Sequence, residues 1–223
     1  MTLLLENLVI KRSNRVLING LSINVNQSEI LEICGNNGSG KTSLLRTVAG
    51  FTTPVSGSHN SQLFKKIFLP SNGGMREELT VIEVTRNFLD CDTETAKEAL
   101  SKFELESFIH SPVVKLSEGQ KKRLMLSRIL YSNVCLLLID EPFNALDYEG
   151  RQKFLNSLNL FCSSGGIAII ATHISLMDVL NDKKTLNKDF DFCWPTHKLE
   201  LGIQSSQKFK LSTARSTKKN LTK

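Results

Sequence analysis

Residues 33–47 read ICGNNGSGKTSLLRT, and this stretch contains a complete phosphate-binding loop. The pattern Gly-x-x-x-x-Gly-Lys-[Ser/Thr] is matched by Gly35, Gly40, Lys41 and Thr42. An apolar strand expected at residues 29–34 leads into the loop, and an amphipathic helix expected at residues 41–49 follows it. In this context the sequence predicts a site for a nucleoside triphosphate, rather than a Gly-rich turn before an ordinary helix.

The chemistry of the loop follows from its backbone and from two side chains. Successive backbone N–H groups and the positive end of the helix dipole point at phosphate oxygens. Lys41 adds a mobile cation for the terminal phosphates, and the Thr42 hydroxyl is placed to ligate Mg²⁺. The residues expected to hold the nucleotide are Gly35, Asn36, Asn37, Gly38, Ser39, Gly40, Lys41, Thr42 and Ser43.

The composition is that of a globular domain with a basic end. Of the 223 residues, 40% are hydrophobic and 22% are charged, which is ordinary for a globular protein. The net charge of +6 is concentrated at residues 208–223, which hold six Lys or Arg and no acidic residue. We therefore expect one domain at residues 1–205 and a disordered basic tail at residues 206–223. A solvated terminus is favoured for this tail over contact with anionic lipid or nucleic acid.

Cysteine usage and apolar runs indicate the compartment. The five cysteines form no Cys-x-x-Cys pair, which is typical of reduced thiols in a cytosolic protein. No apolar run approaches the roughly 18 residues that span a bilayer, and Glu6 comes too early for a secretory signal. We therefore expect any membrane association to depend on a partner. The cysteines are Cys34, Cys91, Cys135, Cys162 and Cys193.

Hydrophobic periodicity predicts strands that alternate with helices. Short strands at residues 3–10, 16–17 and 21–25 indicate an antiparallel N-terminal β subdomain. Helical spacing at residues 81–108, with a helix at residues 118–131, indicates a helical insertion at about residues 76–130. Further strands are expected at residues 66–69, 135–139 and 167–171, and a further helix at residues 149–161. The predicted fold class is α/β, a mainly parallel sheet with an antiparallel N-terminal β subdomain and a small helical subdomain.

Two carboxylates follow the most apolar of these strands. Asp140 and Glu141 come directly after residues 136–139, at the carboxyl end of the strand, where ligands bind in open α/β sheets. Asp140 is predicted to complete the Mg²⁺ site begun by Thr42. Glu141 is predicted to polarise a water for attack on the γ-phosphate. Such a pair also caps helices, but about 100 residues after a phosphate loop the hydrolytic interpretation leads.

Three further motifs complete an ordered set. Residues 116–120 read LSEGQ, in which Ser117 and the Gly119 N–H form an anion site at a helix start. Residues 144–147 read NALD, and Thr172-His173 follows the last buried strand. Together with the phosphate loop and the paired carboxylates, this order resembles the ATP-binding cassette (ABC) ATPases from residue 3 to about residue 177. The resemblance implies a P-loop NTPase fold of ABC type that uses ATP and Mg²⁺.

The resemblance also implies roles for individual residues. Ser117, Gly119 and Gln120 are expected to contact the nucleotide of a second copy, so that a homodimer encloses two ATP molecules. The loop at residues 144–147 is expected to cross the dimer seam. The expected catalytic residues are Lys41, Glu141 and His173, of which His173 senses the γ-phosphate. After the LSEGQ motif, a solvated helix face is expected for Lys121, Lys122 and Arg123.

The chain departs from the family pattern at three places. Glu118 stands where a small residue is commoner, and it adds negative charge near the phosphates. Asn72 aligns with a glutamine that contacts Mg²⁺, and it is expected as a metal ligand beside Thr42 and Asp140. The aromatic residue that stacks on adenine is missing from the turn at residues 11–15, where the guanidinium of Arg12 or Arg15 can take its place.

Residues 69–83 read LPSNGGMREELTVIE and resemble the same segment of the CcmA group, the haem-exporter ATPases of cytochrome c maturation. That group implies a membrane subunit of CcmB type, a further one of CcmC type, and a place on the cytoplasmic face of the bacterial inner membrane. Haem itself is not expected on this chain, because His59, His110 and His197 lie in polar stretches typical of surface histidines.

Three alternatives stay open. The chain can be the ATPase of an ABC transporter with another substrate, or a soluble cassette ATPase associated with nucleic acid. The basic tail is the feature that favours the second, and we expect no direct contact with nucleic acid. A binding module that does not hydrolyse ATP is the third, suggested by Glu118 and Asn72, but the intact Lys41 and Glu141 argue against it.

Overall fold

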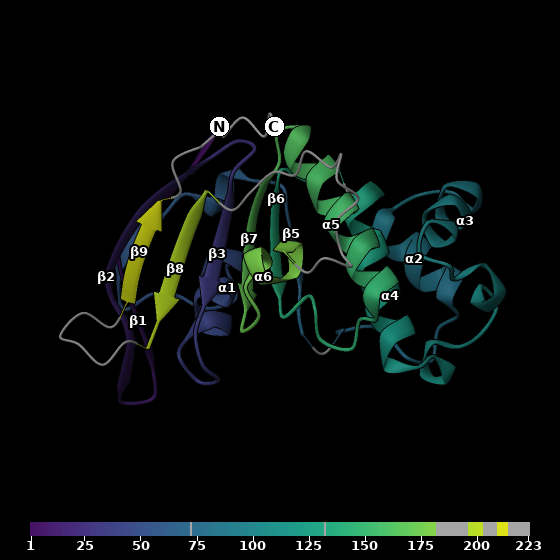
Figure 1. Ribbon diagram of the computed structural model, residues 1–223, viewed down its shortest axis with the longest axis horizontal. Coiled ribbons are helices and arrows are strands. Elements are labelled where there is room, and N and C mark those ends of the chain that lie inside the picture. Colours follow the sequence, from purple (N-terminus) through teal and green to yellow (C-terminus); the bar gives the residue numbers. More distant parts are fainter. Residues whose placement is uncertain (72, 132, 182–195, 203–208, 214–223) are drawn as a thin grey trace.

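The computed structural model describes residues 1–71, 73–131, 133–181, 196–202 and 209–213. Strands occupy one side of the molecule, and helices α2 and α3 lie at the opposite end, beyond α4 and α5 (Figure 1). The helices are α1 (Lys41–Ala49), α2 (Val81–Leu89), α3 (Thr93–Ser101), α4 (Glu118–Tyr131), α5 (Tyr148–Ser163) and α6 (Leu176–Asn181). Short 3-10 turns lie at Ser61–Leu63, Glu106–Phe108 and Val113–Lys115.

A six-stranded sheet forms the centre of the molecule, in the order β5-β6-β7-β3-β8-β9. Its strands are β3 (Ile30–Cys34), β5 (Lys66–Leu69), β6 (Leu136–Asp140), β7 (Ile167–Thr172), β8 (His197–Leu201) and β9 (Phe209–Thr213). All neighbouring pairs are parallel except β8 and β9. The register pairs Asp140 with Ala171 and Cys34 with Thr172, so the carboxyl ends of β6, β7 and β3 lie at one edge. The predicted parallel sheet is confirmed.

A second, antiparallel sheet is built from the N-terminal residues. It has the order β2-β1-β4, with β1 at Thr2–Arg12, β2 at Arg15–Asn26 and β4 at Ser56–His59. Alternate residues of β2 are buried, as in a strand with one face on a core. The predicted N-terminal β subdomain is therefore present, although the strands are longer than the sequence pattern indicates.

Side-chain caps begin several of the helices. Thr80 and Glu83 form a reciprocal capping box at α2, in which the Thr80 hydroxyl accepts from the Glu83 N–H. Asp147 accepts from the Gly150 N–H at the start of α5. These caps fix the residues at which the two helices begin. The residues expected to hold a helical insertion, about 76–130, contain α2, α3 and nearly all of α4.

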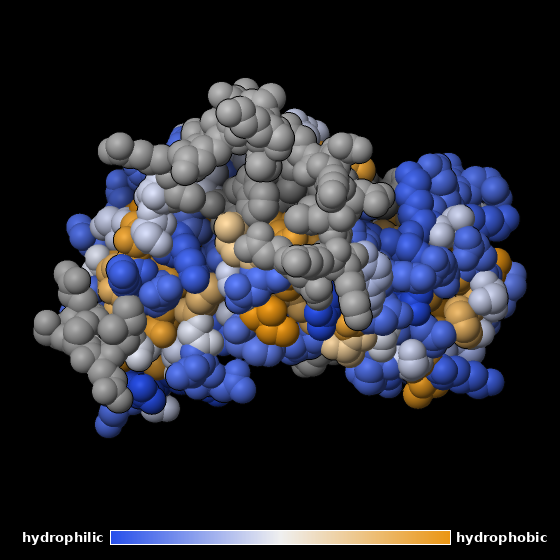
Figure 2. Space-filling view, in the orientation of Figure 1, coloured by the Kyte–Doolittle hydropathy of each residue, from blue (hydrophilic) through white to orange (hydrophobic). Residues whose placement is uncertain are grey.

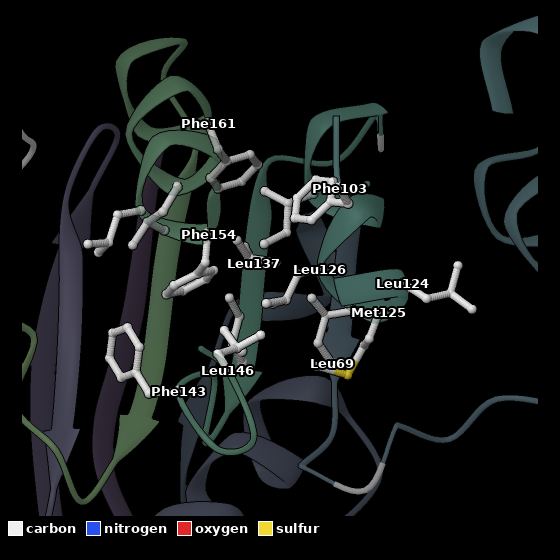
Figure 3. Packing of buried hydrophobic residues seen from close by; sticks show 14 of the residues in the cluster. Leu69, Phe103, Leu124, Met125, Leu126, Leu137, Phe143, Leu146, Phe154 and Phe161 are labelled. Carbon is white, nitrogen blue, oxygen red and sulfur yellow. The ribbon is translucent and has the colours of Figure 1, made fainter. Parts of the chain in front are cut away.

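Two apolar clusters hold the central sheet on its two faces. One lies between the sheet and helices α2 to α6, and the other lies between the sheet, α1 and the antiparallel sheet. Figure 3 shows the first cluster, where Phe143 and Phe154 point toward each other. Their rings meet edge to face, with centroids 5.5 Å apart and an interplanar angle of 81°. Because Phe143 lies two residues after Glu141, this packing anchors the loop that carries the predicted base.

The predicted tail boundary is wrong. Residues 209–213 were expected in a disordered basic tail, but they form β9, which pairs antiparallel with β8. Phe209 and Leu211 alternate along β9 and pack against the cluster on the α1 side of the sheet, which stabilises the pairing. Residues 214–223 lie outside the described part of the chain.

The described helices include none that is both long enough and apolar enough to cross a membrane. The face seen in Figure 2 is mostly hydrophilic where α2 and α3 lie. Among the described residues, Cys34, Cys91, Cys135 and Cys162 form no disulfide bond, and Cys193 lies outside the described residues. Burial, as the main cause, raises the pKa of the Cys34 thiol to about 12.

Candidate active site

The phosphate loop, the paired carboxylates and the histidine meet in one pocket of about 340 Å³ at the carboxyl edge of the central sheet. Five parts of the chain build it, since the loops after β3, β5, β6 and β7 and the adjoining ends of β1 and β2 all contribute to its lining. The lining residues are Arg12, Leu17, Asn36, Asn37, Gly38, Gly40, Lys41, Thr42, Ser43, Ser71, Asp140, Glu141, Asn144 and His173. The predicted Gly35 and Ser39 belong to the loop but do not line the pocket.

Lys41 lies folded over the loop at the start of α1. Its ammonium donates to the Gly35 carbonyl oxygen at 2.7 Å and lies 3.4 Å from Glu141 Oε1. A Cβ added at Gly35 would lie 2.7 Å from Ser39 Oγ and 2.8 Å from the Leu201 carbonyl oxygen, so only glycine fits there. The loop is therefore tightly packed behind Lys41, whose cation faces the pocket.

Thr42 and Asp140 form the oxygen pair that was predicted for the metal. The Thr42 hydroxyl donates to Asp140 Oδ2 at 2.8 Å. Asp140 Oδ1 is buried and has no hydrogen-bond partner among the described residues. Burial raises the pKa of the Asp140 carboxyl, and the Thr42 hydrogen bond opposes that rise. A carboxylate oxygen without a partner, beside a hydroxyl, is a donor set that suits Mg²⁺ once phosphate and water oxygens complete it.

Glu141 and His173 are in direct contact. His173 Nδ1 lies 2.7 Å from Glu141 Oε2, and the His173 backbone N–H donates to the same oxygen at 3.3 Å. The Glu141 backbone is held as well, because its N–H donates to the Ala171 carbonyl oxygen at 2.8 Å. With Nδ1 donating to the carboxylate, the imidazole Nε2 is left free to meet a ligand. The pair has the geometry of a base that is oriented by a histidine.

The LSEGQ segment lies outside this pocket. Ser117 Oγ accepts from the Gln120 N–H at 3.2 Å, and Gln120 Oε1 accepts from the Ser117 N–H at 2.9 Å, which is a capping box at the start of α4. Glu118 is 82% exposed, 3.5 Å from Lys121 Nζ, and Lys121 also pairs with Glu77 at 2.8 Å. Of the described residues, Ser117, Gly119 and Gln120 contribute nothing to the pocket of their own chain.

The expectation of a solvated helix face is wrong for Lys122. Its side chain is buried, and Nζ donates to the Glu141 carbonyl oxygen at 2.7 Å. Burial lowers the pKa of Lys122 to about 8, although Asp140 and Glu141 oppose that shift. A sequence signal for this burial exists, because Lys122 precedes the buried Leu126 and Ile129 by four and seven residues. Lys121 and Arg123 are partly exposed and form ion pairs.

The remaining predicted residues fall into three groups. Arg12 lines the pocket, whereas Arg15 does not. Asn72 lies outside the described residues, so its predicted contact with Mg²⁺ stays a prediction. His197 was expected at the surface, but it lies in β8 with Nε2 3.1 Å from Glu29 Oε2. His59 is likewise partly buried, in β4, with Nδ1 2.9 Å from Ser61 Oγ.

Comparison with known proteins gives three consistent matches. A family model described as ABC transporter matches residues 18–144. The cytochrome c biogenesis ATP-binding export protein CcmA of Methylococcus capsulatus (strain Bath) is 33% identical over 198 residues, which cover 82% of this chain and 95% of that protein. CcmA of Escherichia coli (strain K12) is 33% identical over 180 residues, which cover 75% of this chain and 87% of that protein.

A solved structure supports the fold. The dimeric post-hydrolysis state of an ATP-binding cassette bound to ADP and Pi aligns with a TM-score of 0.72 and 21% identity. The alignment covers 89% of this chain and 94% of that one. The predicted ABC-type arrangement of the α/β fold is therefore confirmed.

Proposed function

Because the chain belongs to the ABC transporter family, we propose that it is the ATP-hydrolysing subunit of a CcmA-type transporter, which serves haem export in cytochrome c biogenesis. One observation carries the enzymatic part: Lys41, Asp140, Glu141 and His173 converge on the same pocket as the phosphate loop. The CcmA assignment is supported by 33% identity that extends over 95% of the Methylococcus protein.

The residues of the pocket supply the groups that ATP hydrolysis needs. The phosphate loop and Lys41 bind and orient the triphosphate. Glu141 accepts a proton from a water whose oxygen attacks the γ-phosphorus. The bond from that phosphorus to the bridging oxygen breaks, and ADP and phosphate result. His173 holds the Glu141 carboxylate through its Nδ1 contact at 2.7 Å, and its other ring nitrogen is available to the γ-phosphate.

Mg²⁺ fits the oxygen pair beside the loop. The Thr42 hydroxyl and the Asp140 carboxylate are the residues that would hold it, and Asn72 is a further proposed ligand. When bound, the ion neutralises charge on the phosphate oxygens. The unpartnered Asp140 Oδ1 supports this assignment, and the role of Glu141 as proton acceptor does not depend on it.

The active form is proposed to be a homodimer. Ser117, Gly119 and Gln120 lie at the start of α4 and outside their own pocket. The Ser117 oxygen accepts one hydrogen bond from the Gln120 N–H, so its hydroxyl hydrogen is still available to a phosphate. A second copy, arranged with two-fold symmetry, would present these residues to the nucleotide. The dimeric state of the related cassette supports this arrangement.

The transport partner is proposed to be an integral membrane subunit of CcmB type, with one of CcmC type as a further partner. The ATPase would then be held at the cytoplasmic face of the bacterial inner membrane by that subunit. ATP binding would close the dimer and hydrolysis would open it, and the motion would pass to the membrane subunit. Haem would be handled by the partners, and this chain would supply the free energy.

A mixing experiment tests the shared site. Lys41→Ala removes the phosphate cation of a chain's own loop, and Ser117→Arg blocks the contact that it makes with its partner. Each variant alone should be inactive, whereas their mixture should recover about a quarter of the native ATPase rate, because half of the dimers then keep one intact site of two. If each chain carried a complete site by itself, mixing the two variants would restore nothing.

Co-purification from membranes tests the subgroup. The wild-type chain, extracted with mild detergent and cross-linked, should recover a membrane subunit of CcmB type. Recovery of a permease unrelated to cytochrome c biogenesis would assign the chain to a transporter with another substrate. Recovery of nucleic acid alone, released by nuclease, would favour the soluble cassette ATPase.

A further inference from the structure

We propose that Lys122 is a positioning residue that couples the LSEGQ segment at the start of α4 to Glu141 of the same chain. Lys122 stands two residues after Gln120, and its ammonium donates to the Glu141 carbonyl oxygen at 2.7 Å. The inference rests on the proposed ATPase and its homodimer. It concerns the connection, inside one chain, between the LSEGQ segment, which would contact the partner's nucleotide, and Glu141, which would act on the chain's own nucleotide.

One face of α4 docks on the loop that follows β6. Gly119, Lys122 and Arg123 are spaced three and four residues apart, so they share a face of the helix. A Cβ added at Gly119 would lie 3.0 Å from the Ala145 carbonyl oxygen, which shows a close approach of the helix to this loop. Arg123 Nη2 lies 3.8 Å from Asp147 Oδ2. Lys122 is the middle contact of three between α4 and residues 141–147.

The Lys122 contact falls at Glu141, the proposed proton acceptor, whose orientation the reaction requires. Glu141 has a φ of 50°, in the left-handed region that a residue with a side chain rarely adopts. Its N–H is held by the Ala171 carbonyl oxygen in β7, and its own carbonyl oxygen is held by Lys122. The backbone is therefore fixed from the sheet on one side and from α4 on the other, which keeps the unusual conformation in place.

The presence of a lysine at position 122 argues against a purely structural role for this side chain. Position 122 lies on the apolar face of α4 with the buried Leu126 and Ile129, where leucine or methionine would pack without desolvating a charge. Burial lowers the pKa of the Lys122 ammonium, and the nearby negative charges of Asp140 and Glu141 oppose that shift. A buried cation at this point thus balances the acidic pair at the end of β6 and binds its backbone at the same time.

The consequence concerns the two nucleotides of the dimer. In the proposed homodimer the LSEGQ segment contacts the partner's nucleotide, whereas Glu141 acts on the nucleotide of its own chain. A shift of the start of α4 when the partner's nucleotide binds would therefore reach Glu141 through Lys122. Loss of the contact should lower turnover and uncouple the sites, while the phosphate loop still binds ATP.

Steady-state kinetics of the full chain test this. Lys122→Met should lower kcat by about 10- to 100-fold, as expected for a misplaced catalytic group, with KM for ATP within about twofold and a Hill coefficient that falls toward 1. Lys122→Arg, which keeps a cation and a donor, should recover most of the loss. Lys97→Met is the matched control, since Lys97 forms an exposed ion pair with Glu94 in α3, away from the LSEGQ segment and the pocket, and its kcat and Hill coefficient should stay at the native values.

The outcomes separate the two proposals. If the native chain hydrolyses ATP and Lys122→Met keeps its kcat and Hill coefficient, the coupling role is overturned and the ATPase assignment stands. A native chain without ATPase activity overturns the proposed function itself. Should Lys122→Met fail to fold, as judged by circular dichroism, Lys122→Gln decides. A lower kcat at unchanged KM in that variant supports the proposal, and native kinetics contradict it.

Discussion

Glu141→Gln is the substitution that tests the catalytic assignment most directly. The change removes the proton acceptor but keeps the size of the side chain and one oxygen that can accept from the His173 N–H. General base catalysis contributes roughly 10²- to 10⁴-fold, so kcat should fall by that factor, which corresponds to about 2.7–5.4 kcal/mol in the activation barrier.

Nucleotide binding should survive the same change. Lys41 loses its ion pair with Glu141 at 3.4 Å, and one negative charge is removed beside the phosphates. Both effects favour a bound triphosphate, so the Kd for ATP should stay the same or fall. The rate of phosphate release measures kcat, and equilibrium titration with a fluorescent ATP analogue measures the affinity for the nucleotide.

The matched control is Glu94→Gln, an exposed position in α3 that pairs with Lys97. It should change neither kcat nor the Kd for ATP, because such an exposed ion pair contributes little to the stability of the fold. Hydrolysis by Glu141→Gln within about threefold of the native rate would refute the assignment, since a true general base leaves at least a hundredfold deficit. Weakened ATP binding with unchanged kcat would instead assign Glu141 to substrate binding.

Three other substitutions test the pocket wall, the core and a helix cap. Arg12→Ala should raise KM for ATP several-fold at unchanged kcat, because Arg12 lines the pocket but is not one of the proposed catalytic residues; an unchanged KM would exclude it from nucleotide binding. Phe154→Ala should lower the free energy of unfolding by about 3–5 kcal/mol, measured by urea titration, because the fully buried ring packs on Phe143; a loss below 1 kcal/mol would contradict this packing. Asp92 has a pKa lowered by the Thr95 N–H, so Asp92→Ala should reduce Tm above pH 3.8, and the difference should vanish as the pH falls through the lowered value; a pH-independent difference would mean that the cap acts without its charge.

Local sequence patterns were sufficient to predict the helices and strands next to the candidate site. The helix expected at residues 41–49 is α1, the strand expected at residues 66–69 is β5, and the helix expected at residues 118–131 is α4, each with the predicted bounds. In each case an apolar repeat and a turn or capping residue mark the element within a few neighbouring residues. The residues proposed to be catalytic could be picked out for the same reason, because each stands at the end of such an element.

Contacts between residues far apart in the chain explain why the sequence patterns did not predict strands β8 and β9 or the burial of Lys122. Strands β8 and β9 have five residues each and mix polar with apolar side chains, and they are stable because β8 pairs with β3 and β9 pairs with β8. Lys122 was misplaced for a related reason. Its charge suggested exposure to solvent, and the Glu141 carbonyl oxygen that accepts its hydrogen bond lies 19 residues away in the chain.

The pairing of β6 with β7 makes the active site sensitive to chain length inside these strands. Asp140 lies opposite Ala171, which brings Glu141 within reach of His173. Deleting one residue from either strand would turn the side chains that follow to the opposite face of the sheet. Insertions in the segment from residue 163 to residue 166, by contrast, would leave that register untouched. A relative that shares every motif residue but differs by one residue within β6 or β7 should therefore be expected to lack the Glu141–His173 contact.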